Sequence, residues 1–198
     1  MANVLLITEP PVQALPLRLA LLGSGYSVLD ELDCAPEPNA TATLVKRVRE
    51  IGAAVLIIAT KSPSASLMAA LQAIDREEPH PVLLFTNDTN TDNIETATQA
   101  GVASYVIDGF SAKRLRTLVD VALAKFRATQ ALRQRAVDAE QKLAERKLID
   151  RAKGILMKTR NMSEEEAYHA LRKLAMERQQ SLGTTADQVI AMAKLLAA

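Results

Sequence analysis

The stretch IDRAKGILMKTRNMSEEEAYHALRKLAMER, residues 149–178, decides how the C-terminal part of this chain folds. Its first part predicts one face of an amphipathic helix, because apolar residues recur at three- and four-residue steps: Ile149, Ala152, Ile155 and Leu156. After a break at 160–162, Ser163 and Glu166 have the spacing of a capping box, which satisfies free N–H groups at a helix start. A second amphipathic helix follows, with its apolar face made by Ala167, Ala170, Leu171, Leu174 and Ala175.

The polar sides of these two helices carry a dense set of cations: Arg151, Lys153, Lys158, Arg160, Arg172, Lys173 and Arg178. Positive charge concentrated on a compact helical unit needs an anion, and the polyphosphate chain of a nucleic acid is the first candidate. Tyr168 is the one aromatic residue after Phe126, so it is either a surface for base stacking or a ring packed in the bundle with its hydroxyl outside. Met157 and Met176 are expected in the core.

Several motifs in this stretch together resemble the ANTAR domain, the RNA-binding module of AmiR- and NasT-type antiterminators. They are Ala152-Lys153-Gly154-Ile155-Leu156-Met157, then Ser163-Glu-Glu-Glu-Ala167-Tyr168, then Leu171-Arg172 and Ala175-Met176, and the resemblance covers residues 146–198. It implies that dimers bind a two-hairpin motif in nascent leader mRNA, so that a terminator does not form and polymerase reads through. Lys153 and Arg172 lie inside the matched motif and are the cations first expected to bind RNA.

Composition narrows the class of protein further. The 198 residues are 48% apolar and 24% charged, as in ordinary globular proteins, and no apolar run approaches the roughly 20 residues of a membrane span. The single cysteine, Cys34, cannot form an internal disulfide and suits the reducing cytoplasm. One Cys and two distant His residues do not predict a metal site, and no nucleophile–base pair or phosphate loop predicts an enzyme or a cofactor.

The net charge of +1 hides a division between the two halves of the chain. Residues 1–110 carry 6 Lys/Arg against 13 Asp/Glu, a balance of −7, whereas residues 111–198 carry 18 against 10, a balance of +8. Such asymmetry suggests a nucleic-acid-binding half joined to a half with another task, although long helices also carry solvated cations. The acidic half is interpreted as a surface on which a partner protein docks, and an inert solubilising spacer is the alternative.

Short apolar runs alternate with helical patterns through the first half. The expected strands cover residues 4–7, 26–29, 55–58, 82–85 and 104–107, and the expected helices cover residues 14–22, 44–51, 66–76 and 94–100. This alternation predicts a parallel, doubly wound α/β sheet. Five such units resemble the receiver domain of bacterial response regulators, a flavodoxin-like (CheY-like) fold, which is expected over residues 1–127.

The receiver resemblance implies where a phosphorylation site would lie. A working receiver holds Mg²⁺ with acids after strand one, phosphorylates an Asp ending strand three, and adds a Ser/Thr after strand four and a Lys after strand five. This chain places at those points Thr8, Glu9, Ala59, Thr86 and Asp108. Because Ala59 has no oxygen to phosphorylate, the site is predicted to be degenerate and the domain to be a pseudo-receiver.

Helical sequence without Gly or Pro runs from residue 111 to Gly154. Its middle part, residues 128–147, is predicted to be a dimerising coiled-coil linker, with a rigid monomeric spacer as the alternative. The stripe for this dimer consists of Leu132, Ala136, Ala139 and Leu143. Residues 148–198 are then expected to form a three-helix bundle. In it, Gly154 is expected to mark the close approach of another helix, with direct contact to RNA as the alternative. Gly183 is expected to end the second helix, and Thr184 or Thr185 to cap the third, residues 186–196.

Within the family, the segment Tyr105-Val-Ile-Asp108-Gly109-Phe110 and the loop at Ser62-Pro63 are more similar to NasT than to AmiR. That resemblance implies control of nitrate and nitrite assimilation genes, and a nitrate- or nitrite-sensing protein partner that holds the regulator inactive.

Two other classes of protein stay open. One is a DNA-binding response regulator with a helix-turn-helix at residues 160–178, although the acids after Ser163 would face the DNA. The other is a protein-binding adaptor without nucleic-acid binding.

Overall fold

The computed structural model describes residues 3–34, 40–107 and 112–196, and the chain divides into two compact units, residues 1–130 and 131–198. Unit 1 contains a five-stranded parallel sheet in the order β2-β1-β3-β4-β5. The strands are β1 (Asn3–Thr8), β2 (Ser27–Asp33), β3 (Val55–Ala59), β4 (Val82–Thr86) and β5 (Val102–Ile107). The alternating pattern predicted a parallel, doubly wound sheet, and the receiver resemblance implied this flavodoxin-like order, so the predicted fold class is confirmed.

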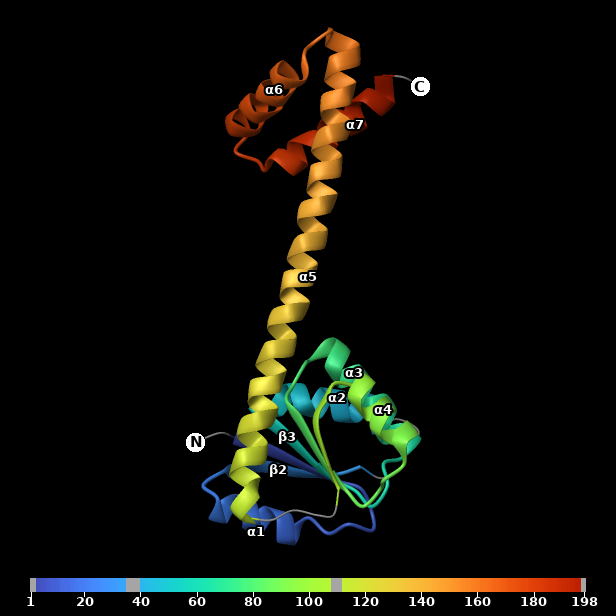
Figure 1. Cartoon of the computed structure of the whole chain (residues 1–198), viewed down its shortest axis with the longest axis vertical. Helices are drawn as coiled ribbons and strands as arrows, with labels where there is room; N and C mark the ends of the chain where they lie inside the picture. The colour runs from blue at the N-terminus through green and yellow to red at the C-terminus, as the bar shows by residue number, and fades with distance from the viewer. Residues whose placement is uncertain (1–2, 35–39, 108–111, 197–198) are drawn as a thin grey trace. The chain divides into compact units, whose positions relative to one another are not determined.

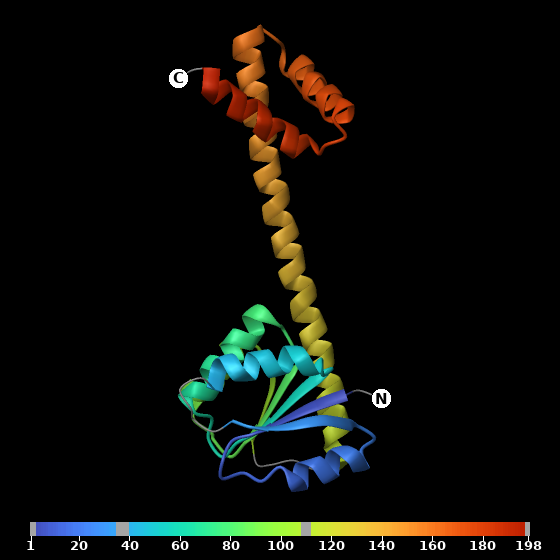
Figure 2. The ribbon, with the colours of Figure 1, turned by 180° about the vertical axis from the view of Figure 1, so that it is seen from behind.

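Helices cover both faces of this sheet (Figures 1 and 2). One face packs on α2 (Ala40–Ile51), α3 (Ala65–Glu77) and α4 (Thr91–Gln99), and the other on α1 (Leu15–Gly23) and the first turns of α5 (Ala112–Arg160). Successive side chains of a strand point to opposite faces, so the central strands feed both cores alternately and are apolar throughout. In β3, for example, Leu56 and Ile58 lie in the first core while Val55 and Ile57 lie in the second.

Two helices of unit 1 begin earlier than the pattern predicted. Helix α2 begins at Ala40 instead of residue 44, since packing of Leu44 and Val45 in the core outweighs the weak helix propensity of the threonines before them. Helix α4 begins at Thr91 instead of residue 94, because Asn90 caps it by accepting a hydrogen bond from the Asp92 amide. The expected loop after residue 34 lies partly outside the described residues.

Helix α5 belongs to both units. Leu115, Val119 and Ala122 are buried in the core of unit 1, while Leu148, Ala152 and Ile155 pack in the core of unit 2. Every residue from 131 to 147 is exposed. The segment between the two cores therefore has no partner among the described residues to bury its apolar side chains.

Unit 2 is a three-helix bundle, in which α6 (Glu164–Glu177) and α7 (Leu182–Leu196) pack on the last turns of α5 (Figure 1). The capping box is confirmed, because the Ser163 hydroxyl accepts from the Glu166 amide and the Glu166 carboxylate accepts from the Ser163 amide. The core is small and consists of four buried residues with partly buried neighbours: Ala152, Leu171, Ala186 and Ile190.

The turn between α6 and α7 differs from the prediction. Helix α6 ends at Glu177, ahead of Gly183, and Gln179 takes a positive φ of 52°. Gly183 instead lies in the first turn of α7, which begins four residues before the predicted residue 186. The cap is Ser181, whose hydroxyl accepts from the Thr184 amide. A carboxylate oxygen of Glu145 on α5 accepts from the Gly183 amide at 3.2 Å, and a Cβ there would lie 2.8 Å from the Glu145 side chain.

None of the helices within the described ranges is long and apolar enough to cross a bilayer.

Candidate nucleic-acid interface

The bundle core determines which side chains of unit 2 point outward. Because Leu148, Ala152 and Ile155 of α5 face α6 and α7, the residues about half a turn away must face outward. On α6, Ala167, Leu171 and Ala175 are buried, so the opposite face of this helix points outward as well. The basic residues predicted to bind RNA are distributed over these outward faces.

These cations fall into two groups by their contacts. The first group is exposed and has no carboxylate partner among the described residues: Arg151, Lys158, Arg160 and Arg172. The second group is engaged by neighbours: Lys173 lies 4.0 Å from the Glu177 carboxylate, Arg178 donates to the Gln188 side chain at 3.0 Å, and Lys153 forms two ion pairs. The first group is the more available to an external anion, because a paired cation must first give up its partner.

Lys153 occupies a different environment from an open RNA-binding position. Its ammonium lies 2.8 Å from Asp150 and 2.7 Å from Glu164, and its side chain is only 15% exposed. Hydrogen bonds to Asp150 and Glu164 raise the pKa of the Lys153 ammonium, and the bond from Lys153 lowers the pKa of Asp150. Lys153 thus ties α5 to the acidic first turn of α6, a contact that joins residues 11 apart in sequence.

Tyr168 offers an outward-facing ring. It is 40% exposed and shares one face of α6 with Arg172 and Met176, at four-residue steps. Its only described ring neighbour is His169, edge-on with ring centroids 6.3 Å apart.

Met157 and Met176 were expected in the core, but both are exposed, and the exposed fraction of Met176 is 71%. Both methionines lie on helix faces turned away from the residues that form the bundle core, so helix orientation leaves them outside.

Gly154 does not mark the close approach of another helix. A Cβ built at this position would meet nothing within 4 Å, so the packing prediction is wrong. Glycine inside a helix costs about 1 kcal/mol relative to alanine, and packing does not explain that cost here.

Lys147 was missed as a candidate for RNA binding, because the sequence pattern assigned it to the linker. It is exposed and lies on the same helical face as Arg151 and Lys158.

Three residues of the predicted degenerate receiver site lie at the carboxyl ends of neighbouring strands in unit 1. Thr8, Ala59 and Thr86 are the last residues of β1, β3 and β4. Asp108 lies outside the described residues. Ala59, where a receiver would carry its phosphoacceptor, presents a methyl group beside a hollow of about 280 Å³.

Glu9 is the residue that a receiver would turn toward Mg²⁺. One of its carboxylate oxygens is bonded within the protein, and the other, Oε1, is buried without a hydrogen-bond partner among the described residues. Glu9 is 5% exposed, and the bonded oxygen accepts from the Thr60 hydroxyl at 2.7 Å and from the Ser64 amide at 3.2 Å. Among the residues whose placement is described, no group of three His, Cys, Asp or Glu could hold a metal ion. The Glu9 carboxylate therefore holds the loop that leads into α3.

The neighbouring loops are also joined. Asp88, after β4, accepts from the side chains of Ser62 and Asn93, and these bonds and one from the Asn90 amide lower the pKa of its carboxyl group. The Thr86 hydroxyl donates to the Lys61 carbonyl at 3.0 Å. Sequence reasoning missed this network, since it connects loops about 26 residues apart that are both merely polar in sequence.

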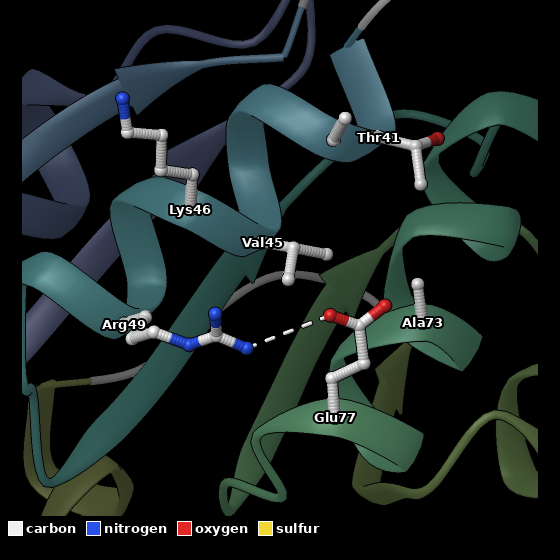
Figure 3. Close-up of a pocket in the computed structure, with 7 residues that line it drawn as sticks. Thr41, Val45, Lys46, Arg49, Ala73 and Glu77 are labelled. Atoms are coloured by element: carbon white, nitrogen blue, oxygen red, sulfur yellow. Dashed lines mark ion pairs between the residues drawn. The ribbon is translucent and has the colours of Figure 1, made fainter.

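Two further surfaces of unit 1 could receive a partner. A hollow of about 400 Å³ lies between α2 and α3. Figure 3 shows the ion pair across it between Arg49 of α2 and Glu77 of α3, whose charged groups lie 3.5 Å apart.

The second surface is on α1, where three exposed leucines lie along one face of the helix: Leu15, Leu19 and Leu22. Of the large apolar side chains described as exposed in unit 1, all but Val121 belong to α1 or to β2. An apolar face of this kind is typical of an interaction site.

The predicted dimer stripe on α5 is exposed along its length. Leu132 is 64% exposed and Leu143 is 54% exposed, and Ala136 and Ala139 between them are exposed as well. Apolar residues at this heptad spacing are the pattern of a coiled-coil seam, which a second helix would cover.

Comparisons with known proteins agree with this two-part organisation. Residues 137–190 match the model of the ANTAR domain family. The chain is 26% identical over 188 residues to the transcriptional regulatory protein PdtaR of Mycobacterium tuberculosis, covering 95% of this chain and 89% of that protein. It is 31% identical over 100 residues to a nitrate regulatory protein of Klebsiella oxytoca, covering 50% of this chain and 25% of that protein.

Among solved structures, the signal receiver domain of a modulated diguanylate cyclase from Desulfovibrio desulfuricans superposes with a TM-score of 0.54 at 15% identity, covering 65% of this chain and 98% of that one. At this identity, the likeness concerns the fold alone.

Proposed function

We propose that this chain, which carries an ANTAR domain behind a receiver-like domain, is an antitermination regulator that binds paired hairpins in nascent leader mRNA. The observation that carries the proposal is the ANTAR match over residues 137–190. It is supported by the exposed cations Arg151, Lys158, Arg160 and Arg172, which lie on helices of that region without a carboxylate partner among the described residues. Such cations fit the phosphates of a folded RNA, and Tyr168 provides a ring for an unstacked loop base.

The same geometry argues against duplex DNA as the target. Helix α6 begins with Glu164, Glu165 and Glu166, all exposed, at the end that a recognition helix would insert into the major groove. The test is to titrate the full chain with a two-hairpin RNA and with duplex DNA of equal charge over a salt series. Tighter binding of the RNA at every salt concentration supports the proposal. Equal affinity would indicate general polyanion binding, and no binding to either would favour a protein-binding adaptor.

In this proposal the receiver-like domain does not respond to phosphorylation. Treating the chain with acetyl phosphate and Mg²⁺ is expected to leave its mass unchanged, because Ala59 has no acceptor oxygen and Glu9 is engaged by Thr60 and Ser64. Intact-mass spectrometry is the measurement, with a receiver domain that contains the Asp as the positive control. A phosphoryl adduct on this chain would show that another side chain accepts phosphate.

The regulatory input is then proposed to be a protein partner in the cytoplasm that docks on unit 1. The exposed leucine face of α1 is the surface that supports this, because it is apolar and uncovered among the described residues. The similarity to a nitrate regulatory protein supports nitrate or nitrite assimilation genes as the target and a nitrate- or nitrite-sensing protein as the partner. Affinity capture from cells grown with and without nitrate tests this: a partner that is released when nitrate is present is expected.

The active form is proposed to be a homodimer formed through Leu132, Ala136, Ala139 and Leu143. Replacing Leu143 by Glu should shift the chain toward monomer by at least about tenfold in dissociation constant, since two carboxylates would meet in the apolar seam. Analytical ultracentrifugation measures this. Gln141→Glu, which adds the same charge on the opposite face of α5, is the control and should leave the dimer intact. A wild-type chain that stays monomeric at high concentration would contradict the dimer.

A further inference from the structure

An open face on α5 combines a glycine with unpaired positive charge. Lys147, Arg151, Gly154 and Lys158 are spaced by four, three and four residues, so they lie along one side of the helix. The three cations are exposed and have no ion-pair partner among the described residues. The four positions extend over about 16 Å of helix, from the 1.5 Å rise per residue.

This face points away from the bundle. The residues of α5 that pack on α6 and α7 are Leu148, Ile149, Ala152, Ile155 and Leu156, which lie on the other side of the helix. That placement agrees with the open space found around Gly154, where a Cβ would meet no atom within 4 Å. The low helix propensity of glycine is therefore not explained by any contact within unit 2.

The absence of a side chain between cations changes what can approach the helix. At Gly154 an incoming group can reach the backbone surface, and Arg151 and Lys158 lie about one turn before and one turn after it on the same side of the helix. A phosphate at this position would accept hydrogen bonds from the cations and contact the glycine Cα without a steric barrier. A Cβ would hold the phosphate further from the helix and lengthen these contacts.

A second copy of the chain would be a poorer occupant. In a parallel two-stranded coiled coil, equivalent positions of the two helices face each other, so the three cations would meet the same three cations. Like charges placed together oppose such packing, whereas a polyanion neutralises them.

We propose that the face formed by Lys147, Arg151, Gly154 and Lys158 is a phosphate-backbone contact of the RNA, with Gly154 as the point of closest approach. This inference rests on the proposed RNA-binding function and assigns part of its surface. Contacts to phosphate position an RNA without reading its bases, so any two-hairpin RNA that the chain binds should use this face.

The test is to replace Gly154 by Ala and by Leu in the full chain. Both residues favour helix more than glycine does, so both variants should melt a few degrees higher than the wild type. If the face contacts phosphate, they should nevertheless bind a synthetic fluorescent two-hairpin RNA more weakly, by about fivefold for Ala and more for Leu, with a flatter salt dependence. If Gly154 instead allowed another helix to pack closely, both variants would be less stable than the wild type. Ala191→Leu, which adds three carbons at an exposed position of α7 against four for Gly154→Leu, is the control and should change neither quantity.

The outcomes separate the hypotheses. Normal RNA affinity in both Gly154 variants, with a wild type that binds the RNA, overturns this inference and leaves the proposed function standing. A wild type that does not bind RNA removes both. Sedimentation of the same variants identifies the other occupant: a changed dimer constant with unchanged RNA affinity would show that a second copy covers this face.

Discussion

Replacing Arg151 and Lys158 together by alanine is expected to weaken binding of a two-hairpin RNA by about twentyfold at 0.15 M salt, because each phosphate that the protein no longer neutralises reduces affinity by about fivefold there. Both side chains are exposed and unpaired among the described residues, so their removal leaves no buried charge and should not unfold the bundle. The slope of log affinity against log salt should become less steep by about 1.5. Fluorescence anisotropy over a salt series measures both quantities.

A matched control separates these two positions from general charge. Lys113→Ala with Arg127→Ala removes one lysine and one arginine from exposed positions of α5 outside the ANTAR match. This control should lower affinity by less than about twofold if RNA lies on unit 2. Equal reductions in the two double variants would mean that only the total charge matters, and the assignment of Arg151 and Lys158 to the interface would be wrong.

Replacing Leu171 by alanine is expected to destabilise unit 2 by about 3 kcal/mol, within the range of about 2–5 kcal/mol for a buried leucine. Leu171 is 1% exposed, and the other fully buried members of its cluster are two alanines and one isoleucine. Leu171 and Ile190 are the two large side chains buried in this cluster, so truncating Leu171 removes a large part of its apolar volume and leaves a cavity. A bundle this small has a narrow margin of stability, and the variant should populate an unfolded unit 2 at 37 °C.

Hydrogen exchange of amides in α6 and α7 is the measurement, since it reports on unit 2 while unit 1 stays folded. Protection in unit 1 should be unchanged, because Leu171 belongs to the core cluster of unit 2, and the two core clusters of unit 1 are built from other residues. Leu195→Ala removes the same atoms from a side chain that is 79% exposed and should cost less than about 0.5 kcal/mol. If both leucine variants exchange like the wild type, the small core is not what holds the bundle together.

The sequence was sufficient for the features that depend on local pattern. The short apolar runs around Val55–Ala59 and Val82–Thr86 predicted strands buried on both faces, and their alternation with helices predicted the parallel sheet. The capping box at Ser163 was also readable, because both of its hydrogen bonds join residues three apart. These features are local, because the residues that predict each helix cap or strand lie in the same short stretch of sequence as the residues that form it.

Contacts between distant residues were not readable in the same way. Lys153 was predicted to bind RNA, yet its ammonium lies between Asp150 and Glu164, and only the packing of α6 on α5 brings Glu164 there. Gly154 was assigned to a helix contact, although the helices that could have approached it pack on the other side of α5. Helical periodicity shows which residues share a face, but tertiary packing decides which face is covered.

The amino-acid sequence is enough to establish an acidic α/β half, with Ala59 at the end of its third strand, and a basic helical half with an ANTAR match, since charge, periodicity and residue identity are properties of the chain. Three-dimensional folding was needed to establish which cations remain free, that Glu9 bonds to Thr60 and Ser64, and that Gly154 lies open. The difference arises because pairing and burial depend on neighbours far apart in sequence, and only folding brings those neighbours together.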